Sequence, residues 1–321
     1  MKDELKKYLI KFDKLNRGVT RYGKAPHKPV LLLSVLQAFN SKFITENRIY
    51  ITPELVRLFN NNWTALVTTK HVCKFALPFY HLKGEKFWHL TAKQGFEKLL
   101  ILIKEISSFG QLNTAIEYAS LDETLFLLMK DKSNNQILQQ FLLEKYFPET
   151  KNNITPSGGG QDNLFDDIQG KILNEDGEEY KAEMRKLINE EKEEEIYIRS
   201  NVFKKAIPLI YKNTCCISGM KIDATVNISM IDACHIVPFS ESYNDPISNG
   251  IALCPNLHRA FDRGLISIDN DYKVIVSDNF HEDATNYSIR SFKGKRIILP
   301  SQQKHYPLPN NLQWHRTNIY R

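Results

Sequence analysis

The chain has 321 residues, of which 42% are apolar and 25% charged, the composition of a globular protein. That length predicts two domains of ordinary size, and no apolar run is long enough for a transmembrane helix. Residues 1–18 lack the apolar core of a secretory signal. The five cysteines are an odd number, so we expect no disulfide framework and a reducing, cytoplasmic location.

The net charge of +6 is unevenly distributed. Residues 1–150 carry +8, residues 151–200 carry −6, and residues 201–321 carry +4. Two basic blocks around an acidic connector predict that both blocks face a polyanion such as DNA. The alternative is that modest positive charge only aids solubility.

The N-terminal block is predicted to mix helices with a β-hairpin. Apolar residues at helical spacing open the chain with a helix; they are Leu5, Tyr8, Leu9, Phe12 and Leu15. A buried helix begins at Pro29 and runs through the apolar stretch 30–36. The aromatic stretches 73–82 and 87–90 flank a turn at 83–86, which predicts a hairpin. Two helical segments follow, at 92–107 and 121–147.

A polar, Gly-rich stretch at 150–163 separates the blocks and is typical of a flexible linker. We therefore place an N-terminal domain at 1–149, the linker at 150–175 and a C-terminal domain at 176–321. The second domain opens with apolar residues at helical spacing in a charged stretch; they are Tyr180, Met184, Leu187 and Ile188. This pattern fits a solvated amphipathic helix, and it fits equally the dimerisation helix of a homodimer.

Three polar residues at wide, ordered spacing dominate the C-terminal block: His235, Asn249 and His258. A neutral histidine can take a proton from water near neutral pH. An amide can orient that ring or bind a metal through its oxygen, and a divalent cation can neutralise a phosphoryl oxygen. Each residue alone has a structural explanation, as a core histidine or an Asn-Gly turn. Together they favour hydrolysis of a phosphodiester.

The surrounding blocks are Ala-Cys-His-Ile-Val-Pro at 233–238, Asn-Gly-Ile-Ala-Leu-Cys at 249–254 and His-Arg-Ala-Phe-Asp-Arg-Gly at 258–264. In this order and spacing they resemble the HNH, or ββα-metal, endonucleases. The resemblance implies that His235 is the general base, that His258 is a metal ligand, and that Asn249 orients the base or supports the metal. It also implies a catalytic group of His235, Asn249 and His258.

The remaining metal ligand is harder to assign. Many members of the family place an acidic residue or a second histidine directly before the base, whereas this chain has Cys234. We predict that Asp232 supplies a carboxylate to Mg²⁺ or Mn²⁺, because hard cations prefer oxygen donors. Arg259 and Arg263 are predicted to contact DNA phosphates. The alternative for Arg263 is an ion pair with Asp262 at the helix end.

The cysteines bear on a structural zinc site, which many HNH domains build from two C-x-x-C pairs. Here Cys216 and Cys254 each lack the second cysteine of such a pair, and Cys215 lies directly beside Cys216. Adjacent thiols are poorly placed to chelate one ion. We therefore expect no structural zinc.

Residues 5–145 resemble the sulfur-binding domain of phosphorothioate-dependent restriction endonucleases. The resemblance rests on Ala-Pro-His-Lys-Pro at 25–29 before an apolar helix, and on Pro78 and the Phe-Trp pair at 87–88. It implies a shallow apolar pocket for a soft sulfur atom, ringed by cations that grip neighbouring phosphates. The implied DNA contacts are Arg21, His27, Lys28, Pro78, Tyr80 and His81. Pro78, His27 and their neighbours also fit purely structural roles.

The sequence thus predicts an α+β protein: an N-terminal mixed helix and hairpin domain that reads DNA, a Gly-rich linker, and a C-terminal ββα-metal nuclease domain. The predicted function is a modification-dependent restriction endonuclease that cuts phosphorothioated double-stranded DNA. Two alternatives remain. One is an HNH endonuclease that reads another base modification or a plain sequence, and the other is an inactive DNA-binding protein.

Overall fold

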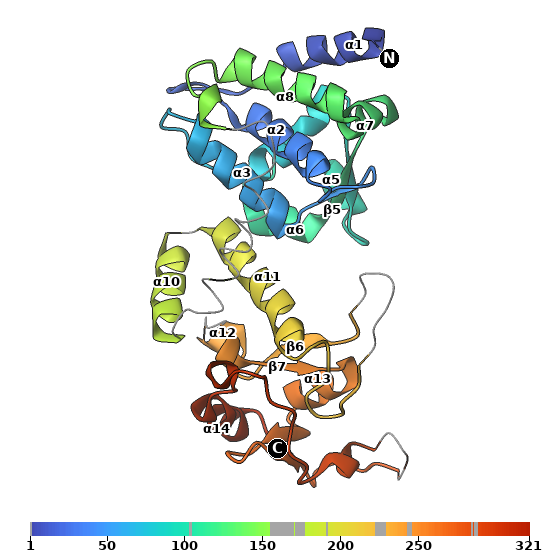
Figure 1. The fold of residues 1–321 in the computed structure, drawn as a ribbon, viewed down its shortest axis with the longest axis vertical. Coiled ribbons are helices and arrows are strands. Elements are labelled where there is room, and N and C mark those ends of the chain that lie inside the picture. The colour runs from blue at the N-terminus through green and yellow to red at the C-terminus, as the bar shows by residue number, and fades with distance from the viewer. Residues whose placement is uncertain are drawn as a thin grey trace. The chain divides into compact units, whose positions relative to one another are not determined.

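A computed structural model describes residues 2–102, 105–154, 170, 177–190, 192–221, 229–242, 246–283, 285 and 288–321. The chain divides into two compact units, Met1–Phe165 and Asp166–Arg321. Both are mixed α+β (Figure 1). The predicted linker falls mostly on 155–169 and 171–176, outside the described residues, whereas 151–153 form a short 3-10 turn. Within the described ranges, no helix has the length and apolar character needed to cross a membrane.

A buried helix forms the centre of unit 1. In α2 every residue from Pro29 to Phe39 is buried, and α3 and α8 pack against it (Figure 1). The helices of this unit are α1 Lys2–Asp13, α2 His27–Asn40, α3 Pro53–Leu66, α4 Ala76–His81, α5 Glu97–Leu102, α6 Phe109–Ala115, α7 Glu123–Lys130 and α8 Lys132–Tyr146. The predicted opening helix and the predicted helix after residue 29 are both confirmed.

The predicted aromatic hairpin is wrong. Residues Ala76–His81 form helix α4 and Leu82–Glu85 form the 3-10 turn η1, while β4 Trp88–Ala92 pairs with β5 Ile116–Leu121. β5 also pairs with β3 Ile49–Tyr50, giving an antiparallel sheet of order β3-β5-β4, and β1 Val19–Thr20 pairs with β2 Gly23–Lys24. Helical spacing buries both Phe75 and Phe79, and Pro78 is tolerated because it lies in the first turn of α4.

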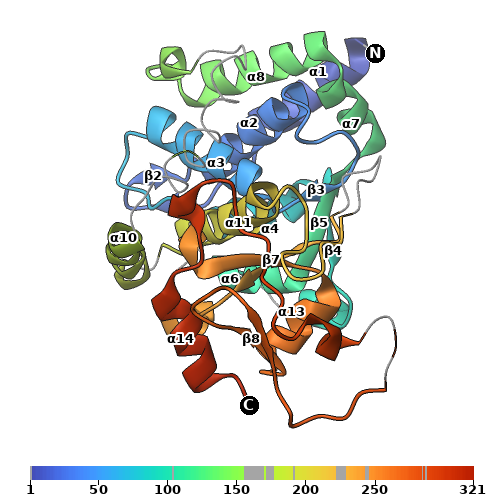
Figure 2. The ribbon, with the colours of Figure 1, turned by 60° about the horizontal axis from the view of Figure 1, so that its bottom comes forward.

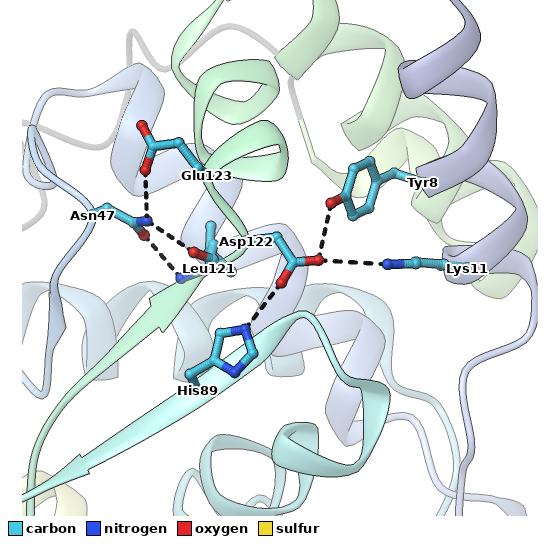
Figure 3. Close-up of polar contacts among 7 residues, drawn as sticks. All are labelled: Tyr8, Lys11, Asn47, His89, Leu121, Asp122 and Glu123. Atoms are coloured by element: carbon cyan, nitrogen blue, oxygen red, sulfur yellow. Dashed lines mark hydrogen bonds and ion pairs between the residues drawn. The ribbon is translucent and has the colours of Figure 1, made fainter.

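The predicted helix 121–147 is interrupted at Asp131, whose Oδ1 accepts a hydrogen bond from the Asn134 N–H at 2.9 Å and caps α8. Just before α7, the Asp122 carboxylate joins α1 to the sheet (Figure 3). It accepts from Tyr8 Oη at 3.0 Å and His89 Nε2 at 2.9 Å, and Lys11 Nζ lies 3.5 Å away. Burial opposes the charge, yet these donors hold the pKa of Asp122 below its ordinary value.

Unit 2 contains two antiparallel strands followed by a short helix. β6 Asp232–His235 pairs with β7 Gly250–Leu253, so that Asp232 lies opposite Leu253 and His235 opposite Gly250, and α13 Pro255–Asp262 follows. The other elements are α10 Gly177–Asn189, α11 Glu193–Ile210, α12 Phe239–Ser242, η3 Ile247–Asn249, β8 Ile266–Ile268, β9 Val274–Val276, η4 Ile289–Phe292, η5 Gln303–His305 and α14 Pro309–Asn318. Figure 2 shows α14 beside β8, which it contacts.

Candidate functional site

The two faces of β6 carry different chemistry, because successive strand residues point in opposite directions. His235 faces α11, where its imidazole stacks on the Phe203 ring with centroids 4.1 Å apart and planes 11° from parallel. Asp232 and Cys234 are both directed toward α13, since each contacts a side chain of that helix.

On α13, His258 lies between two carboxylates. Its Nδ1 is 3.2 Å from Asp232 Oδ2, and its Nε2 is 3.4 Å from Asp262 Oδ2. Asp262 shares the face of His258 because the two are four residues apart on one helix. The predicted ligand Asp232 therefore lies on the opposite side of the imidazole ring from Asp262. Asp262 was not predicted as a partner of His258, although the spacing of four residues indicates it.

Cys234 forms with His258 and Asp262 a group of side chains that could hold a metal ion, since their donor atoms all lie within 4.8 Å of one another. Cys234 Sγ is 3.9 Å from Asp262 Oδ1. Burial and then the nearby Asp262 carboxylate raise the pKa of the Cys234 thiol well above its ordinary value. The thiol is therefore neutral in the metal-free protein, whereas a bound cation would favour the thiolate.

Asn249 is fully buried, and its amide binds the backbone just after His235. Nδ2 donates to the Val237 carbonyl at 2.9 Å, while Oδ1 accepts from the Val237 N–H at 3.0 Å. In unit 1 Asn47 binds the backbone of Leu121 in the same two-point way, with both distances 2.8 Å (Figure 3). The geometry of Asn249 suits orientation of the strand that carries His235. Its role as a metal ligand stays a prediction.

A cavity of about 250 Å³ connects the two faces of this site. It is lined by His235, Ile236, Pro238, Phe239, His258, Asp262, His315 and Ile319. The cavity thus places the predicted base beside His258 and Asp262, two of the three candidate metal ligands. Asp232 and Asn249 are not among its lining residues. Arg259 and Arg263 are exposed on α13 and at its C-terminal end.

Unit 1 has a larger cavity of about 540 Å³. It is lined by Asn16, Arg17, Gly18, Thr20, Ala25, His27, Lys28, Leu77, Pro78, His81, Lys83 and Gly84. Four of the predicted DNA contacts therefore lie around one hollow: His27, Lys28, Pro78 and His81. Tyr80 and Arg21 do not line it. Tyr80 is completely buried beneath Lys83, whose Nζ is 3.7 Å from the ring centroid, and Arg21 is exposed against Tyr22.

The polar groups of this cavity differ in charge. Lys28 Nζ pairs with Glu85 Oε1 at 2.5 Å, so its charge is largely compensated. His27 Nε2 donates to the Val72 carbonyl at 2.9 Å, and burial lowers the pKa of His27 to about 4, which keeps the ring neutral near neutral pH. Arg17 stacks on the Tyr146 ring at 4.6 Å. Arg17 and Lys83 also line the cavity and were not predicted from the sequence, although Arg17 is close to two further basic residues, Arg21 and Lys24.

Residues 215–269 match the family model described as HNH endonuclease. The chain carries an HNH endonuclease domain. This domain spans β6, β7 and α13, and with them the side chains around His258. An HNH domain is a phosphodiester hydrolase, so the predicted enzyme class is confirmed at this level.

Three solved structures resemble the chain at low TM-score. The "Modification dependent TagI restriction endonuclease" is 25% identical, with 36% of this chain and 37% of that chain covered and a TM-score of 0.28. The "Sulfur binding domain of ScoMcrA complexed with phosphorothioated DNA" is 17% identical. The match covers 44% of this chain and 87% of that chain, with a TM-score of 0.33. The "Type IV phosphorothioation-dependent restriction endonuclease ScoMcrA" is 11% identical. The match covers 79% of this chain and 94% of that chain, with a TM-score of 0.30. The chain thus spans well under half of the TagI chain, and no curated protein matches it.

HNH nucleases use a divalent metal, and the side chains of this HNH domain fit one. An imidazole nitrogen, a carboxylate oxygen and a thiol sulfur meet beside a cavity, which leaves room for water or a phosphate oxygen. The second nitrogen of His258 contacts Asp232, the arrangement by which an outer carboxylate fixes a metal-binding histidine.

The remaining cysteines of the HNH domain group differently from the sequence prediction. The Cys215 thiol hydrogen-bonds with that of Cys254, and Ser218 Oγ lies 4.0 Å from Cys254 Sγ. The residue that corresponds to the first cysteine of a C-x-x-C pair is thus Cys215 rather than Cys216, and Ser218 occupies the position of the second cysteine. Cys216 is buried in the apolar core. The absence of structural zinc stays a prediction.

Proposed function

We propose that this protein is a modification-dependent endonuclease in which unit 1 binds phosphorothioated double-stranded DNA and the HNH domain cuts it. The observation that carries this proposal is the composition of the cavity in unit 1. Its wall combines the apolar Leu77 and Pro78 with the cations Arg17 and Lys83. An apolar wall beside cations suits an anion with one soft, weakly hydrated atom.

The difference between sulfur and oxygen explains the selectivity. A phosphorothioate keeps the charge of a phosphate, so Arg17 and Lys83 attract both. A phosphate oxygen against Pro78 loses its water without gaining a hydrogen bond, because proline has no N–H. A sulfur atom loses less on the same wall. Leaving one acceptor unsatisfied costs about 1–3 kcal/mol, which is enough for roughly 5- to 150-fold discrimination.

Compensated charge next to the wall strengthens that selectivity. Glu85 neutralises Lys28, and His27 is uncharged near neutral pH. Fewer free donors therefore point at the bound atom than the count of basic residues suggests. Lys28 and His27 shape the pocket, while Arg17 and Lys83 supply the attraction to the backbone.

In the HNH domain, His235 acts as the general base and removes a proton from the attacking water. Phe203 and the strand fixed by Asn249 hold the ring at the cavity. His258 and Asp262 would hold the divalent cation, and Asp232 would orient His258. When bound, the cation neutralises the phosphoryl oxygen and the leaving oxygen. Arg259 and Arg263 contact the flanking phosphates.

Paired duplexes of one sequence test the proposal. One duplex carries a single phosphorothioate and the other an all-oxygen backbone, each incubated with the protein and Mg²⁺ or Mn²⁺. We expect cleavage near the sulfur and little cleavage of the other duplex. His235→Ala should abolish cleavage while retaining selective binding, and His281→Ala, an exposed histidine of the same unit, should behave like the wild type.

Each alternative predicts a different result. Equal cutting of both duplexes would contradict sulfur recognition and favour a nuclease that reads sequence. Cutting only of DNA with modified bases would assign the cavity to another modification. Binding without cutting, in the presence of any divalent metal, would identify an inactive binding protein.

A further inference from the structure

We propose that Cys234 is a ligand of the divalent metal in the HNH domain, so that this centre binds thiophilic cations such as Co²⁺ or Zn²⁺ in preference to Mg²⁺. The inference deepens the proposed nuclease function and rests on its metal site. Cys234 thereby takes the ligand role that was predicted for Asp232 from the sequence.

The first support is the meeting of three donors from two elements. Cys234 comes from strand β6, while His258 and Asp262 come from one face of helix α13. Their donor atoms already lie within 4.8 Å of one another. Ligands of one metal at bonds of about 2.0–2.3 Å lie about 3–4 Å apart, so modest side-chain rotations close the site.

The second support is the position of Asp232. Its carboxylate contacts His258 Nδ1, whereas Asp262 contacts Nε2. Only one nitrogen of an imidazole binds a given metal. If Nε2 faces the metal together with Asp262, then Asp232 lies on the far side of the ring and orients it. Cys234, which contacts Asp262, is then on the metal side.

The third support is the surroundings of the thiol. Cys234 is completely buried, and most buried free cysteines behave as small apolar residues. Cys216, also completely buried, belongs to the same apolar core but is not part of the donor group. Cys234 differs because its sulfur, which contacts the His235 carbonyl at 3.6 Å, also lies within 4.8 Å of a carboxylate oxygen of Asp262 and a ring nitrogen of His258. That environment is typical of a metal ligand.

A sulfur ligand changes which metal the centre prefers. Thiolates bind borderline and soft cations strongly and Mg²⁺ weakly, because Mg²⁺ prefers oxygen. Two protein ligands, His258 and Asp262, remain for Mg²⁺. Three are available for Co²⁺ or Zn²⁺, with open positions facing the cavity that His235 lines.

Cobalt binding to the metal-free 321-residue chain tests the assignment without DNA. Titration with CoCl₂, in buffer without thiol reductant, should produce the sulfur-to-cobalt charge-transfer absorption in the near ultraviolet. Cys254→Ser, which breaks the other thiol pair, should retain the band. Cys234→Ser should lose it, and calorimetry should show at least about tenfold weaker Co²⁺ binding with unchanged Mg²⁺ binding.

Two results would overturn the proposal. One is the absence of the band in both the wild type and Cys254→Ser, which does not depend on how Cys234→Ser folds. The other is an equal loss of Co²⁺ and Mg²⁺ affinity in Cys234→Ser, which would indicate a structural role. Because no DNA is present, failure of the cleavage assay leaves both measurements unaffected.

Discussion

The imidazole of His235 and the phenyl ring of Phe203 stack almost parallel, with centroids 4.1 Å apart. Phe203 lies on α11, before the segment that matches the HNH family model. The stacked Phe203 ring lets the His235 imidazole rotate within its own plane but prevents it from tilting toward Phe203. The helix preceding the HNH motif thus positions the residue proposed as its base.

Phe203→Leu should therefore reduce catalysis more than stability. Phe203→Leu replaces a fully buried ring by a smaller apolar side chain, which costs about 1–2 kcal/mol, whereas a misplaced base lowers kcat by about 10- to 100-fold. Steady-state cleavage should show a lower kcat with little change in KM, and urea denaturation should show a nearly intact fold. The apolar exchange Val202→Leu, at the buried neighbour of Phe203, is the control. Loss of stability without loss of kcat would mean that the stack only packs the core.

The two carboxylates beside His258 should contribute unequally to metal binding. Asp262→Asn removes a proposed ligand, and Asp232→Asn removes only the group that orients His258, which typically costs about 10- to 100-fold in affinity. Calorimetry with Mn²⁺ should therefore show the larger loss for Asp262→Asn. Asp271→Asn, an exposed acid of the same unit, should bind like the wild type. A larger loss of Mn²⁺ affinity in Asp232→Asn than in Asp262→Asn would identify Asp232 as the ligand.

The placement of the candidate nuclease residues was largely predictable because they are close in sequence. His235 lies on β6, Asn249 ends the 3-10 turn η3 directly before β7, and His258 lies on the helix after β7, so their order and spacing carry the geometry. The nitrogen of His258 that each of Asp232 and Asp262 contacts was not predictable in the same way. It depends on which side of the His258 ring each carboxylate reaches, and only the packing of α13 on β6 decides that.

The N-terminal unit was less predictable, for two physical reasons. Aromatic residues at 75, 79 and 80 fit a strand or a helix, and burial of Phe75 and Phe79 on one side selects the helix. The cavity unites segments that are some 50 residues apart, so no local pattern reveals it. His27 and Pro78 were found through a family resemblance, whereas Arg17 and Lys83 carried no motif.

Gly264→Ala should destabilise unit 2 strongly. Gly264 follows α13 with φ of +72°, and an added Cβ would lie 2.0 Å from the Ile319 carbonyl oxygen. Backbone strain costs about 1–2 kcal/mol, and displacing the backbone at Ile319 should add more. Gly294→Ala separates the two effects, because Gly294 has φ of +77° and an added Cβ there meets no atom within 4 Å. Urea denaturation should give a lower free energy of unfolding for Gly264→Ala than for Gly294→Ala. Equal losses of stability would mean that the chain near Ile319 moves to accommodate the added Cβ.

Pro78→Ser should weaken the discrimination between sulfur and oxygen. The serine hydroxyl gives the cavity wall a donor for a phosphate oxygen, so the penalty on ordinary DNA falls by about 1.4 kcal/mol, or tenfold in relative affinity. Fluorescence anisotropy with the paired duplexes measures this ratio. Pro148→Ser, at an exposed proline that does not line this cavity, should keep the wild-type ratio. An unchanged ratio in Pro78→Ser would place the sulfur elsewhere.

Acid should destabilise unit 1 partly through His27. Burial lowers the pKa of His27 from 6.5 to about 4, so between these values the unfolded chain binds a proton that the folded unit does not. Stability therefore falls as pH drops from about 6.5 toward 4, by up to about 3 kcal/mol for this group. His27→Gln keeps a donor for the Val72 carbonyl but does not titrate. Urea denaturation at pH 7 and pH 5 should show a smaller loss of stability for this variant than for the wild type.

Asp122, whose pKa is also lowered, contributes to both proteins alike and cancels from the comparison. Identical losses would mean that the His27 ring is protonated without leaving its site.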